Sequence, residues 1–351
     1  MTTTGSTSDD RSQLLKRLFP NRVPVLWCPL LTHYSSDGAI DSARMAAHLE
    51  HLSSYVKGFL IPGSTGDGWE MNDAEIRQLL AIAIEECKRL DLNLLIGVLK
   101  TDAREVLKTM AQTVDWLGSR ANGRSVEDSL AEAKVCGFTV CAPRGKELSQ
   151  EEIESALVSV LETGFPIAVY QLPQITQNEI GAELASRLAH RFANFILFKD
   201  TSGADRVVLS GLSLAGVFTV RGAEGDYARW LNTAGGSYQG FLLSTANCFA
   251  RELHQIIGDI SEKRMDGARQ MAARLTSVVA EVFQLVNSVP EGNPFANGNK
   301  AIDHFFAHGP RAAEISPPRL HAGSRLPLEV IRATGEALSR HGLMPIKGYL
   351  E

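Results

Sequence analysis

A lysine that directly follows a fully apolar run is the residue in this sequence best suited to covalent chemistry. The run Phe195-Ile196-Leu197-Phe198 leads straight into Lys199. Burying a lysine as a cation costs free energy, so this environment favours a lowered pKa and a neutral amine. A neutral amine can attack a ketone and form a Schiff base. The alternative is a strand-end lysine whose ammonium reaches solvent along its flexible stem.

A tyrosine ends another apolar run, in the segment Val169-Tyr170-Gln171-Leu172-Pro173. A phenol near an imine nitrogen can relay protons, which would make Tyr170 a partner for the lysine. The alternative is a half-buried packing residue whose hydroxyl lies in water.

A third segment, Gly63-Ser64-Thr65-Gly66-Asp67, has the composition of an anion-binding turn. Glycines let backbone amides converge on an anion, and the two hydroxyls add donors. The predicted guest is a carboxylate or a phosphate. An ordinary glycine turn is the alternative.

These segments lie at the ends of strand-like runs that alternate with helix-period segments. The eight runs are Val23–Leu30, Gly58–Pro62, Asn93–Leu99, Gly137–Ala142, Pro166–Tyr170, Phe195–Lys199, Val217–Arg221 and Ser237–Leu243. Near-continuous apolar strands indicate a parallel sheet covered by helices. Eight such units, with no nucleotide-binding glycine fingerprint, predict an α/β fold of the (β/α)8 TIM barrel type. Its active site would lie at the carboxyl ends of the strands.

The chain divides into three parts on this interpretation. Residues 1–20 are expected to be a polar N-terminal tail, and residues 21–262 the catalytic barrel. An insertion at about 117–128 interrupts the third helix of the barrel. Residues 263–351 form a C-terminal helical extension, with helices expected at Asp266–Val289, Ala296–His308 and Leu328–Arg340.

Four blocks together resemble the dihydrodipicolinate synthase / N-acetylneuraminate lyase family. Gly63–Asp67 resembles its Gly-Thr-Thr-Gly-Glu signature, and Tyr170–Pro173 its Tyr-Asn-x-Pro motif. Phe198–Gly203 resembles the block around its Schiff-base lysine. Gly240–Asn247 resembles its eighth-strand Gly-x-x-Ser-x-x-Ala-Asn segment. The resemblance runs from about Val23 to Val289.

The resemblance implies a role for each of these residues. Lys199 would attack the C2 ketone of a 2-oxo acid, and Tyr170 would relay protons. Gly63, Ser64 and Thr65 would hold the C1 carboxylate. Because the iminium on Lys199 acts as the electron sink, neither a metal nor an organic cofactor is expected. The family also implies a homo-oligomer, a dimer or a tetramer.

Departures from the family pattern bear on the substrate. Ile175 occupies the position of the arginine that binds the second substrate in the synthase branch, and Arg144-Gly145 replace its tyrosines. We therefore expect no lysine-biosynthetic dihydrodipicolinate synthase activity. Lys100, Arg144 and Arg221 follow strands and could bind a distal anionic group of a longer substrate. The alternative is that they are solvated charges at the rim.

Composition excludes several other classes of protein. The net charge of −5 gives no basic excess for nucleic acid, and no apolar run is long enough for a membrane span. The first ten residues lack the apolar stretch of a signal peptide. The five cysteines are an odd number without a Cys-x-x-Cys pair, which favours reduced thiols in the cytoplasm.

Other candidate site residues have simpler interpretations. His48 and His51, and His304 and His308, have spacings compatible with metal binding. No third ligand is apparent, so we expect both pairs on the surface. Glu224 and Asp226 are expected to open the seventh helix and favour its dipole.

The sequence therefore predicts a Schiff-base-forming lyase that acts on a small-molecule 2-oxo acid. The reaction would be aldol cleavage or condensation, or dehydration, of a 2-oxo-3-deoxy sugar acid or a related compound. The alternative is a non-catalytic sensor barrel that binds a 2-oxo acid. Presence of Lys199, Tyr170 and the Ser64-Thr65 pair together favours the enzyme.

Overall fold

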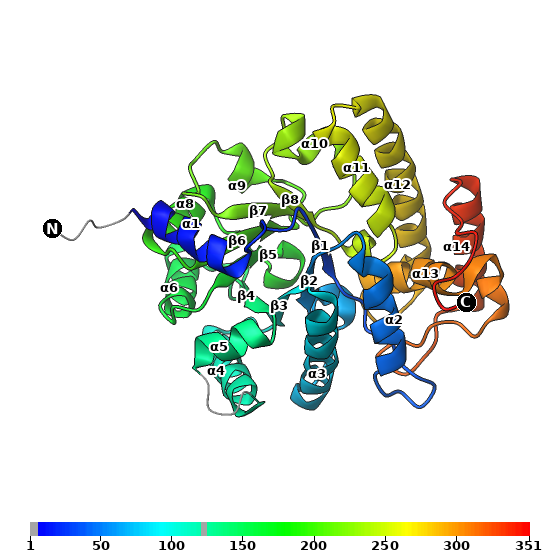
Figure 1. Cartoon of the computed structure of the whole chain (residues 1–351), viewed down its shortest axis with the longest axis horizontal. Coiled ribbons are helices and arrows are strands. Elements are labelled where there is room, and N and C mark those ends of the chain that lie inside the picture. Colours follow the sequence, from blue (N-terminus) through cyan, green and yellow to red (C-terminus); the bar gives the residue numbers. More distant parts are fainter. Residues whose placement is uncertain (1–5, 121–124) are drawn as a thin grey trace.

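Eight parallel strands close into a barrel in chain order (Figure 1). The computed structural model describes residues 6–120 and 125–351. The strands are β1 Leu26–Pro29, β2 Gly58–Ile61, β3 Asn93–Val98, β4 Val135–Cys141, β5 Ile167–Gln171, β6 Phe195–Asp200, β7 Phe218–Arg221 and β8 Gly240–Leu242. Each overlaps one of the expected runs, and the predicted TIM barrel is confirmed.

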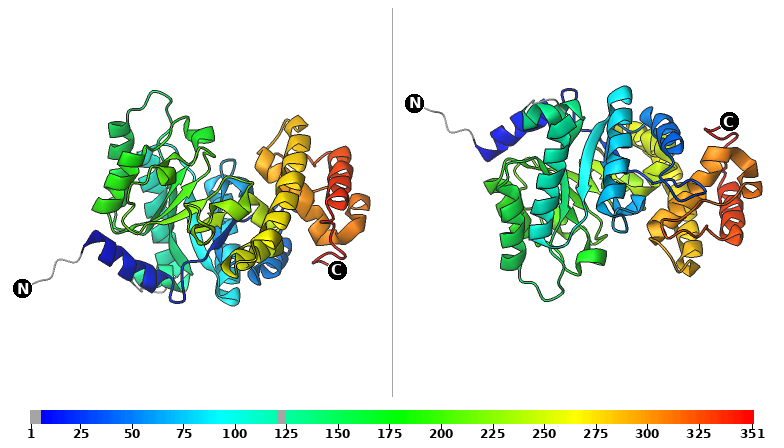
Figure 2. Two further views of the ribbon diagram at one scale, coloured as in Figure 1. Left: turned by 90° about the horizontal axis from the view of Figure 1, so that it is seen from above. Right: turned by 90° about the horizontal axis from the view of Figure 1, so that it is seen from below.

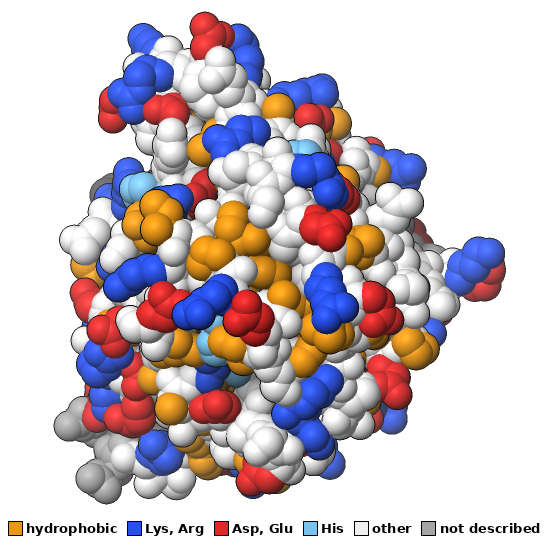
Figure 3. Space-filling view, turned by 90° about the vertical axis from the view of Figure 1, so that its right-hand side faces the viewer, with side chains coloured by type: hydrophobic (Ala, Val, Ile, Leu, Met, Phe, Trp, Pro, Cys, Tyr) orange, Lys and Arg blue, Asp and Glu red, His pale blue; other side chains and the backbone are white. Residues whose placement is uncertain are grey.

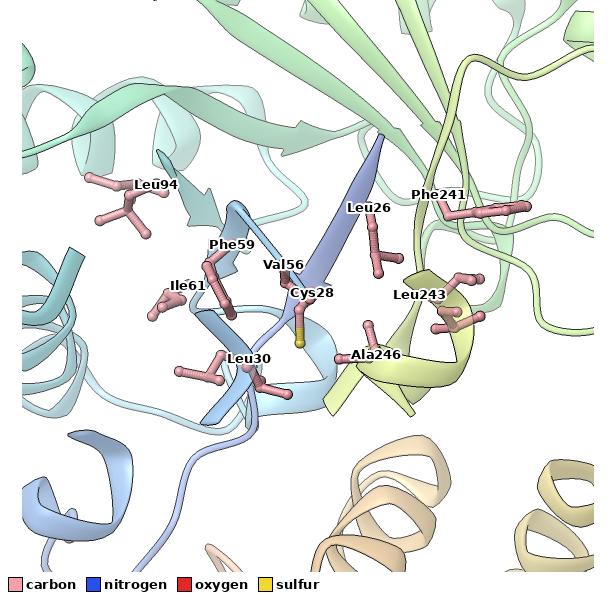
Figure 4. Close-up of a cluster of buried hydrophobic side chains, with 14 of the residues drawn as sticks. Leu26, Cys28, Leu30, Val56, Phe59, Ile61, Leu94, Phe241, Leu243 and Ala246 are labelled. Atoms are coloured by element: carbon pink, nitrogen blue, oxygen red, sulfur yellow. The ribbon is translucent and has the colours of Figure 1, made fainter. Parts of the chain in front are cut away.

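Helices surround this barrel on its outer face (Figure 2). They are α2 Ser42–Ser53, α3 Asp73–Leu90, α4 Ala103–Arg120, α5 Val126–Glu132, α6 Gln150–Leu161, α7 Pro173–Thr176, α8 Ala182–Arg191, α9 Arg206–Leu209, α10 Tyr227–Trp230 and α11 Ala250–Ser261. Apolar side chains of the strands and helices fill the layer between them, as Figure 4 shows around Cys28 and Phe59.

Local sequence signals set the starts of two of these helices. Asn72 and Glu75 form a capping box at α3, and Ser149 and Glu152 form one at α6. The boxes satisfy backbone N–H groups that lack an intrahelical partner, three at α3 and two at α6. Both helices turn an apolar stripe toward the barrel, and Leu79 and Leu157 are buried in it.

The prediction of a polar tail over residues 1–20 is wrong for most of that range. Helix α1, Thr7–Leu18, lies against the amino-terminal end of the barrel. Arg11 is fully buried, and its Nε donates to the carbonyl of Phe195 at the start of β6 (2.8 Å). Phe19, which follows the helix, packs edge-on against Trp27 in the barrel interior. The composition of residues 1–20 does not predict this helix, because the apolar stripe of α1 is narrow. Residues 1–5 lie outside the described residues.

The expected insertion at 117–128 is only partly seen. Helix α4 continues without interruption to Arg120, and α5 begins at Val126. Residues 121–124, which include Asn122 and Gly123 of the predicted loop, lie outside the described residues.

The C-terminal extension consists of α12 Met265–Leu285, α13 Pro294–His308 and α14 Leu328–Arg340. The three helices pack together on one side of the barrel, away from α1 (Figures 1 and 2). Helix α13 reaches the turns that follow β2 and β8, so the extension touches the carboxyl ends of the strands. Within the described ranges, no helix combines the length and apolar character that a membrane span needs.

Candidate active site

Lys199 lies inside the barrel near the carboxyl end of β6. All six residues of this strand are buried, and the lysine side chain is 3% exposed. Burial lowers the pKa of Lys199 from 10.5 to about 7, against the opposing influence of Cys141 and Glu224. A large fraction of the amine is therefore neutral near pH 7, as nucleophilic attack requires.

The space for the Lys199 side chain depends on a glycine in the next strand's loop. A Cβ atom on Gly222 would lie 2.9 Å from Cε of Lys199 and 2.4 Å from Cγ2 of Thr201. A larger residue there would push the lysine out of position. On the opposite side Tyr170 is the register partner of Lys199, and Nζ lies 4.0 Å from its ring centroid.

Tyr170 links the lysine to the turn after β2. Burial raises the pKa of its phenol, and hydrogen bonding with the side chains of Ser64 and Thr201 opposes that shift. The phenol therefore stays protonated at neutral pH and is able to donate a proton. Its position between Lys199 and Ser64 agrees with the predicted grouping of these residues.

The segment Gly63–Asp67 forms a 3-10 turn, η1 Ser64–Gly66, at the mouth of the barrel. The amides of Ser64 and Thr65 open this turn and, in the described chain, donate to no other group. The Ser64 hydroxyl accepts a hydrogen bond from Nε1 of Trp69 (2.8 Å), which orients it. Two free amides and an oriented hydroxyl beside Tyr170 suit a carboxylate.

The sequence did not reveal that Glu224 lies near the site, where its charge raises the pKa of Lys199 against the effect of burial. This residue was expected to open a helix, yet α10 begins at Tyr227 and the carboxylate turns toward β8 instead. Oε1 accepts from Oγ of Ser244 (2.7 Å) and from the amide of Thr245 (3.1 Å). Oε2 accepts from Oγ1 of Thr245 (2.7 Å) and from the Tyr227 hydroxyl (2.9 Å). The hydroxyl pair Ser244-Thr245 at a strand end was the available signal, since such donors need an acceptor.

Arg221, one of the three cations expected at the mouth, is buried and bonds to groups of the protein itself. It makes a two-pronged ion pair with Asp205 (3.0 and 3.2 Å) and donates to the carbonyl of Ala223 (2.7 Å). The guanidinium also covers the ring of Trp230. Arg221 therefore shapes the loop that carries Glu224, and its predicted contact with a distal anion is wrong.

Lys100 and Arg144 lie on neighbouring loops at the rim. The amide of Arg144 donates to the carbonyl of Thr101 (3.0 Å), which brings the two loops together. Arg144 is exposed and Lys100 is half-buried. Neither side chain has a hydrogen-bond or ion-pair partner within residues 6–120 and 125–351, so both remain available to a ligand.

Apolar side chains gather around Tyr170. Cys141, Tyr170 and Leu172 form a buried cluster, with Trp69 and Ile175 packed against it. This cluster is suited to a carbon chain, and the Glu224 carboxylate, whose charge acts on Lys199, lies near the same lysine.

The histidine pairs are not both on the surface, as was expected. His48 and His304 are buried, and His48 lies beside His33 and Asp303. The His48 Nε2–H donates to the carbonyl of Asn247 (2.8 Å), so its Nδ1 accepts from His33 Nε2 (2.9 Å). Arg44 already pairs with the carboxylate of Asp303 (2.7 Å). These hydrogen bonds use the lone pair that a metal would need, and the group serves to fasten α2 to α13.

The rate of imine formation is expected to follow the ionisation of Lys199. Because only the neutral amine attacks, the rate with pyruvate should fall about tenfold per pH unit below about pH 7 and level off above it. Stopped-flow or borohydride-quenched rates between pH 5 and 10 would measure this. A rate that keeps rising to pH 10 would mean that the lysine has its ordinary pKa.

Comparison with known proteins places the chain in a family. The sequence profile of the dihydrodipicolinate synthetase family matches residues 24–291, so the chain belongs to this family. No curated protein matches the sequence.

Solved structures share the fold at low sequence identity. YagE, an Escherichia coli K12 prophage protein of the dihydrodipicolinic acid synthase family in complex with pyruvate, is 19% identical, with a TM-score of 0.69 over 91% of this chain and 99% of its own. A Sulfolobus solfataricus 2-keto-3-deoxygluconate aldolase variant in complex with L-2-keto-3-deoxygalactonate is 16% identical, with a TM-score of 0.69 and coverage of 91% and 96%. Dihydrodipicolinate synthase from Thermotoga maritima is 16% identical, with a TM-score of 0.69 and coverage of 92% and 99%.

Proposed function

We propose that this protein is a Schiff-base-forming lyase that acts on a 2-oxo acid. The observation that carries the proposal is the Lys199 amine, buried at a strand end with a pKa of about 7 and 4.0 Å from the ring centroid of Tyr170. Family membership and the pyruvate and 2-keto-3-deoxy acid ligands of two structural relatives support the same chemistry.

The reaction would begin when neutral Lys199 attacks the C2 carbonyl of the substrate. Tyr170 gives a proton to the carbinolamine oxygen, which leaves as water, and the C=N bond of the iminium forms. In aldol cleavage the C4 hydroxyl loses its proton and the C3–C4 bond breaks, so that its electron pair forms an enamine. In dehydration the C3 proton is lost first and the C4 hydroxyl leaves with the electron pair. After cleavage, C3 of the enamine takes up a proton, which restores the iminium. Water then hydrolyses the iminium from either route and frees Lys199.

The chain's own residues divide the remaining tasks. The amides of Ser64 and Thr65 and the Ser64 hydroxyl would hold the C1 carboxylate. Glu224 would accept from a hydroxyl of the carbon chain, in competition with Tyr227, Ser244 and Thr245, which already bind it. A 2-oxo-3-deoxy sugar acid offers a carboxylate at one end and hydroxyls further along. Such a compound would meet both the turn amides and Glu224, whereas pyruvate carries no hydroxyl for Glu224.

Trapping with sodium borohydride tests this proposal. A panel of 2-oxo acids, each incubated with the protein and borohydride, should add the mass of the reduced ligand to the intact chain. Turnover of a trapped ligand would show the enzyme, whereas trapping without turnover across the panel would favour the sensor barrel. A panel that gives no adduct would overturn the proposal.

Arg144→Ala is expected to raise KM for a substrate with a distal anion. Because Arg144 is exposed, the increase should be about tenfold, the low end for a hydrogen bond to a charged group. Steady-state kinetics with the long substrate, beside imine formation with pyruvate, would separate the two ends of the ligand. Pyruvate kinetics should stay unchanged.

The exposed Lys146 on the same loop supplies the matched control, since Lys146→Ala removes a charge without the predicted contact. An unchanged KM in Arg144→Ala would mean that Arg144 does not bind the distal anion, and Lys100 would be the next candidate. Efficient condensation of pyruvate with aspartate semialdehyde would refute the exclusion of synthase activity that rests on Ile175.

A homo-oligomer, a dimer or a tetramer, is expected in solution. The C-terminal extension exposes large apolar side chains, and Figure 3 shows apolar groups gathered across the face that this extension forms. Those exposed in residues 263–351 are Phe295, Ile315, Leu328, Ile346 and Leu350. Apolar surface of this kind is typical of contacts between subunits. Light scattering should give two or four times the chain mass of 38.1 kDa, and a monomer would contradict this expectation.

A further inference from the structure

A buried ion pair joins the C-terminal extension to the turn that follows β2. Nζ of Lys300, on α13, lies 2.5 Å from Oδ2 of Asp67, and the two side chains are 1% and 5% exposed. The Tyr34 hydroxyl donates to the same carboxylate oxygen (3.1 Å), and the ammonium lies 4.9 Å from the Tyr34 ring centroid. Residues 233 positions apart in sequence are thus in direct contact.

Asp67 ends the turn whose free amides belong to Ser64 and Thr65. Its backbone has φ of 60°, a left-handed conformation that is uncommon for a residue with a side chain. The next residue back, Gly66, has no room for a Cβ, because the carbonyl oxygen of Leu30 would lie 2.3 Å away. The turn therefore has one narrowly defined shape, and the Lys300–Asp67 contact holds its far end.

The segment that precedes α13 holds the near end of the same turn. Nδ2 of Asn293, the N-cap of α13, donates to the carbonyl of Ser64 (3.3 Å). Both ends of the turn are therefore tied to a single helix of the extension. A movement of α13 would move the Ser64 and Thr65 amides with it.

A gain in the free energy of unfolding does not by itself explain a buried ion pair such as Lys300–Asp67. Removing two charges from water usually costs as much as their attraction returns, and an apolar replacement of both is often neutral. What a buried pair does supply is a defined geometry, because Lys300 and Asp67 share the contact with Tyr34 and, among the described residues, neither charge has a second ion-pair partner. This points to a role in the shape of the carboxylate-binding turn.

We propose that Lys300 is a positioning residue for the turn that binds the substrate's C1 carboxylate. The proposal rests on the proposed function, since it takes a 2-oxo acid as the ligand of that turn. Lys300 would act through Asp67, and its removal would weaken capture of the carboxylate while leaving the chemistry of Lys199 intact. The C-terminal extension is then a working part of the site.

The test measures how borohydride trapping of pyruvate depends on pyruvate concentration. In Lys300→Met the half-saturating concentration should rise about 10- to 100-fold, the loss expected for hydrogen bonds to a charged group. The trapping rate at saturation should change by less than about threefold, because Lys199 and Tyr170 are untouched. Lys347→Met, an exposed lysine of the same extension, is the matched control and should behave as wild type.

A double variant separates positioning from stability. Lys300→Met leaves Asp67 as an unpaired buried charge and should lower the free energy of unfolding, whereas Lys300→Met with Asp67→Asn carries no such charge. Asparagine tolerates the left-handed backbone at position 67. The double variant should recover stability but keep the raised half-saturation. It also serves as the test protein if Lys300→Met fails to fold.

Two results would overturn the positioning role. One is a half-saturation in Lys300→Met equal to that of wild type. The other is a half-saturation that returns to the wild-type value together with stability in the double variant. If wild type itself traps neither pyruvate nor any other 2-oxo acid, the proposed function fails, and the positioning role fails with it.

Discussion

Lys199→Ala is expected to abolish turnover of every 2-oxo acid substrate while the barrel remains folded. The amine is the only group in the proposed reaction that forms a covalent bond to the substrate, so no neighbouring residue can replace it. Activity assays with the best substrate of the panel, beside circular dichroism, would measure both effects. Residual turnover above roughly one part in 10⁴ of wild type would contradict the role given to this lysine.

Burial of Lys199 should lower the free energy of unfolding, and the variant Lys199→Met allows this loss to be measured. Between about pH 7 and pH 10.5 the unfolded chain binds a proton at Lys199 that the folded chain does not. The free energy of unfolding of the wild type therefore rises with pH through this window. Below the window, the folded state is destabilised by the full amount that corresponds to the lowered pKa of Lys199. At pH 7 Lys199→Met should be more stable by roughly 3–5 kcal/mol and should lose this pH dependence. Denaturant unfolding at pH 7 and pH 10 would show it, and a variant less stable than wild type at pH 7 would contradict it.

Tyr170→Phe is expected to lower the rate by roughly 10²–10⁴-fold, the usual contribution of a positioned proton donor. The ring that packs against Lys199 is kept, so the loss would come from the hydroxyl alone. Single-turnover kinetics should place the loss in imine formation or in the bond-breaking step. Near-wild-type rates would mean that Tyr170 serves only to pack the barrel interior.

Trp69→Phe is a useful control for this variant. It removes the donor to Ser64 but leaves the phenol in place. Binding of the carboxylate should weaken, whereas the bond-breaking step should not. The two variants together separate proton relay from substrate positioning.

The residues that the sequence predicts well are those whose placement depends on one strand. Lys199, Tyr170 and the turn Gly63–Asp67 each follow an apolar run, and in a parallel barrel all strand ends meet at one rim. Alternating strands and helices are enough to predict this arrangement. No knowledge of distant contacts is needed.

The residues that were missed depend on contacts between segments far apart in the chain. Glu224 is held near Lys199 because Ser244 and Thr245 of the next unit bind its carboxylate. Lys300 meets Asp67 across 233 residues, and nothing in its local sequence marks it as buried. The ion pair of Arg221 is hidden from the sequence for the same reason, since its partner Asp205 comes from the preceding unit.

The packing of the N-terminal helix against the barrel could not be predicted from its sequence pattern. Helix α1 is polar on average, yet its Arg11 is buried. The guanidinium of Arg11 donates to the backbone carbonyls of Phe195 and Phe192, which belong to the barrel. Burial of a charged residue through carbonyl groups leaves no apolar signature. Only the assembled barrel, whose amino-terminal end exposes those carbonyls, reveals the role of this helix.

The whole proposed reaction depends on the Schiff base at Lys199. Reduction with borohydride in the presence of pyruvate, followed by proteolysis and mass spectrometry, tests it most directly. We expect one modified residue, Lys199, with the added mass of a reduced pyruvyl group. An adduct on Lys100, the other lysine at a strand end of the mouth, with Lys199 unmodified, would contradict it.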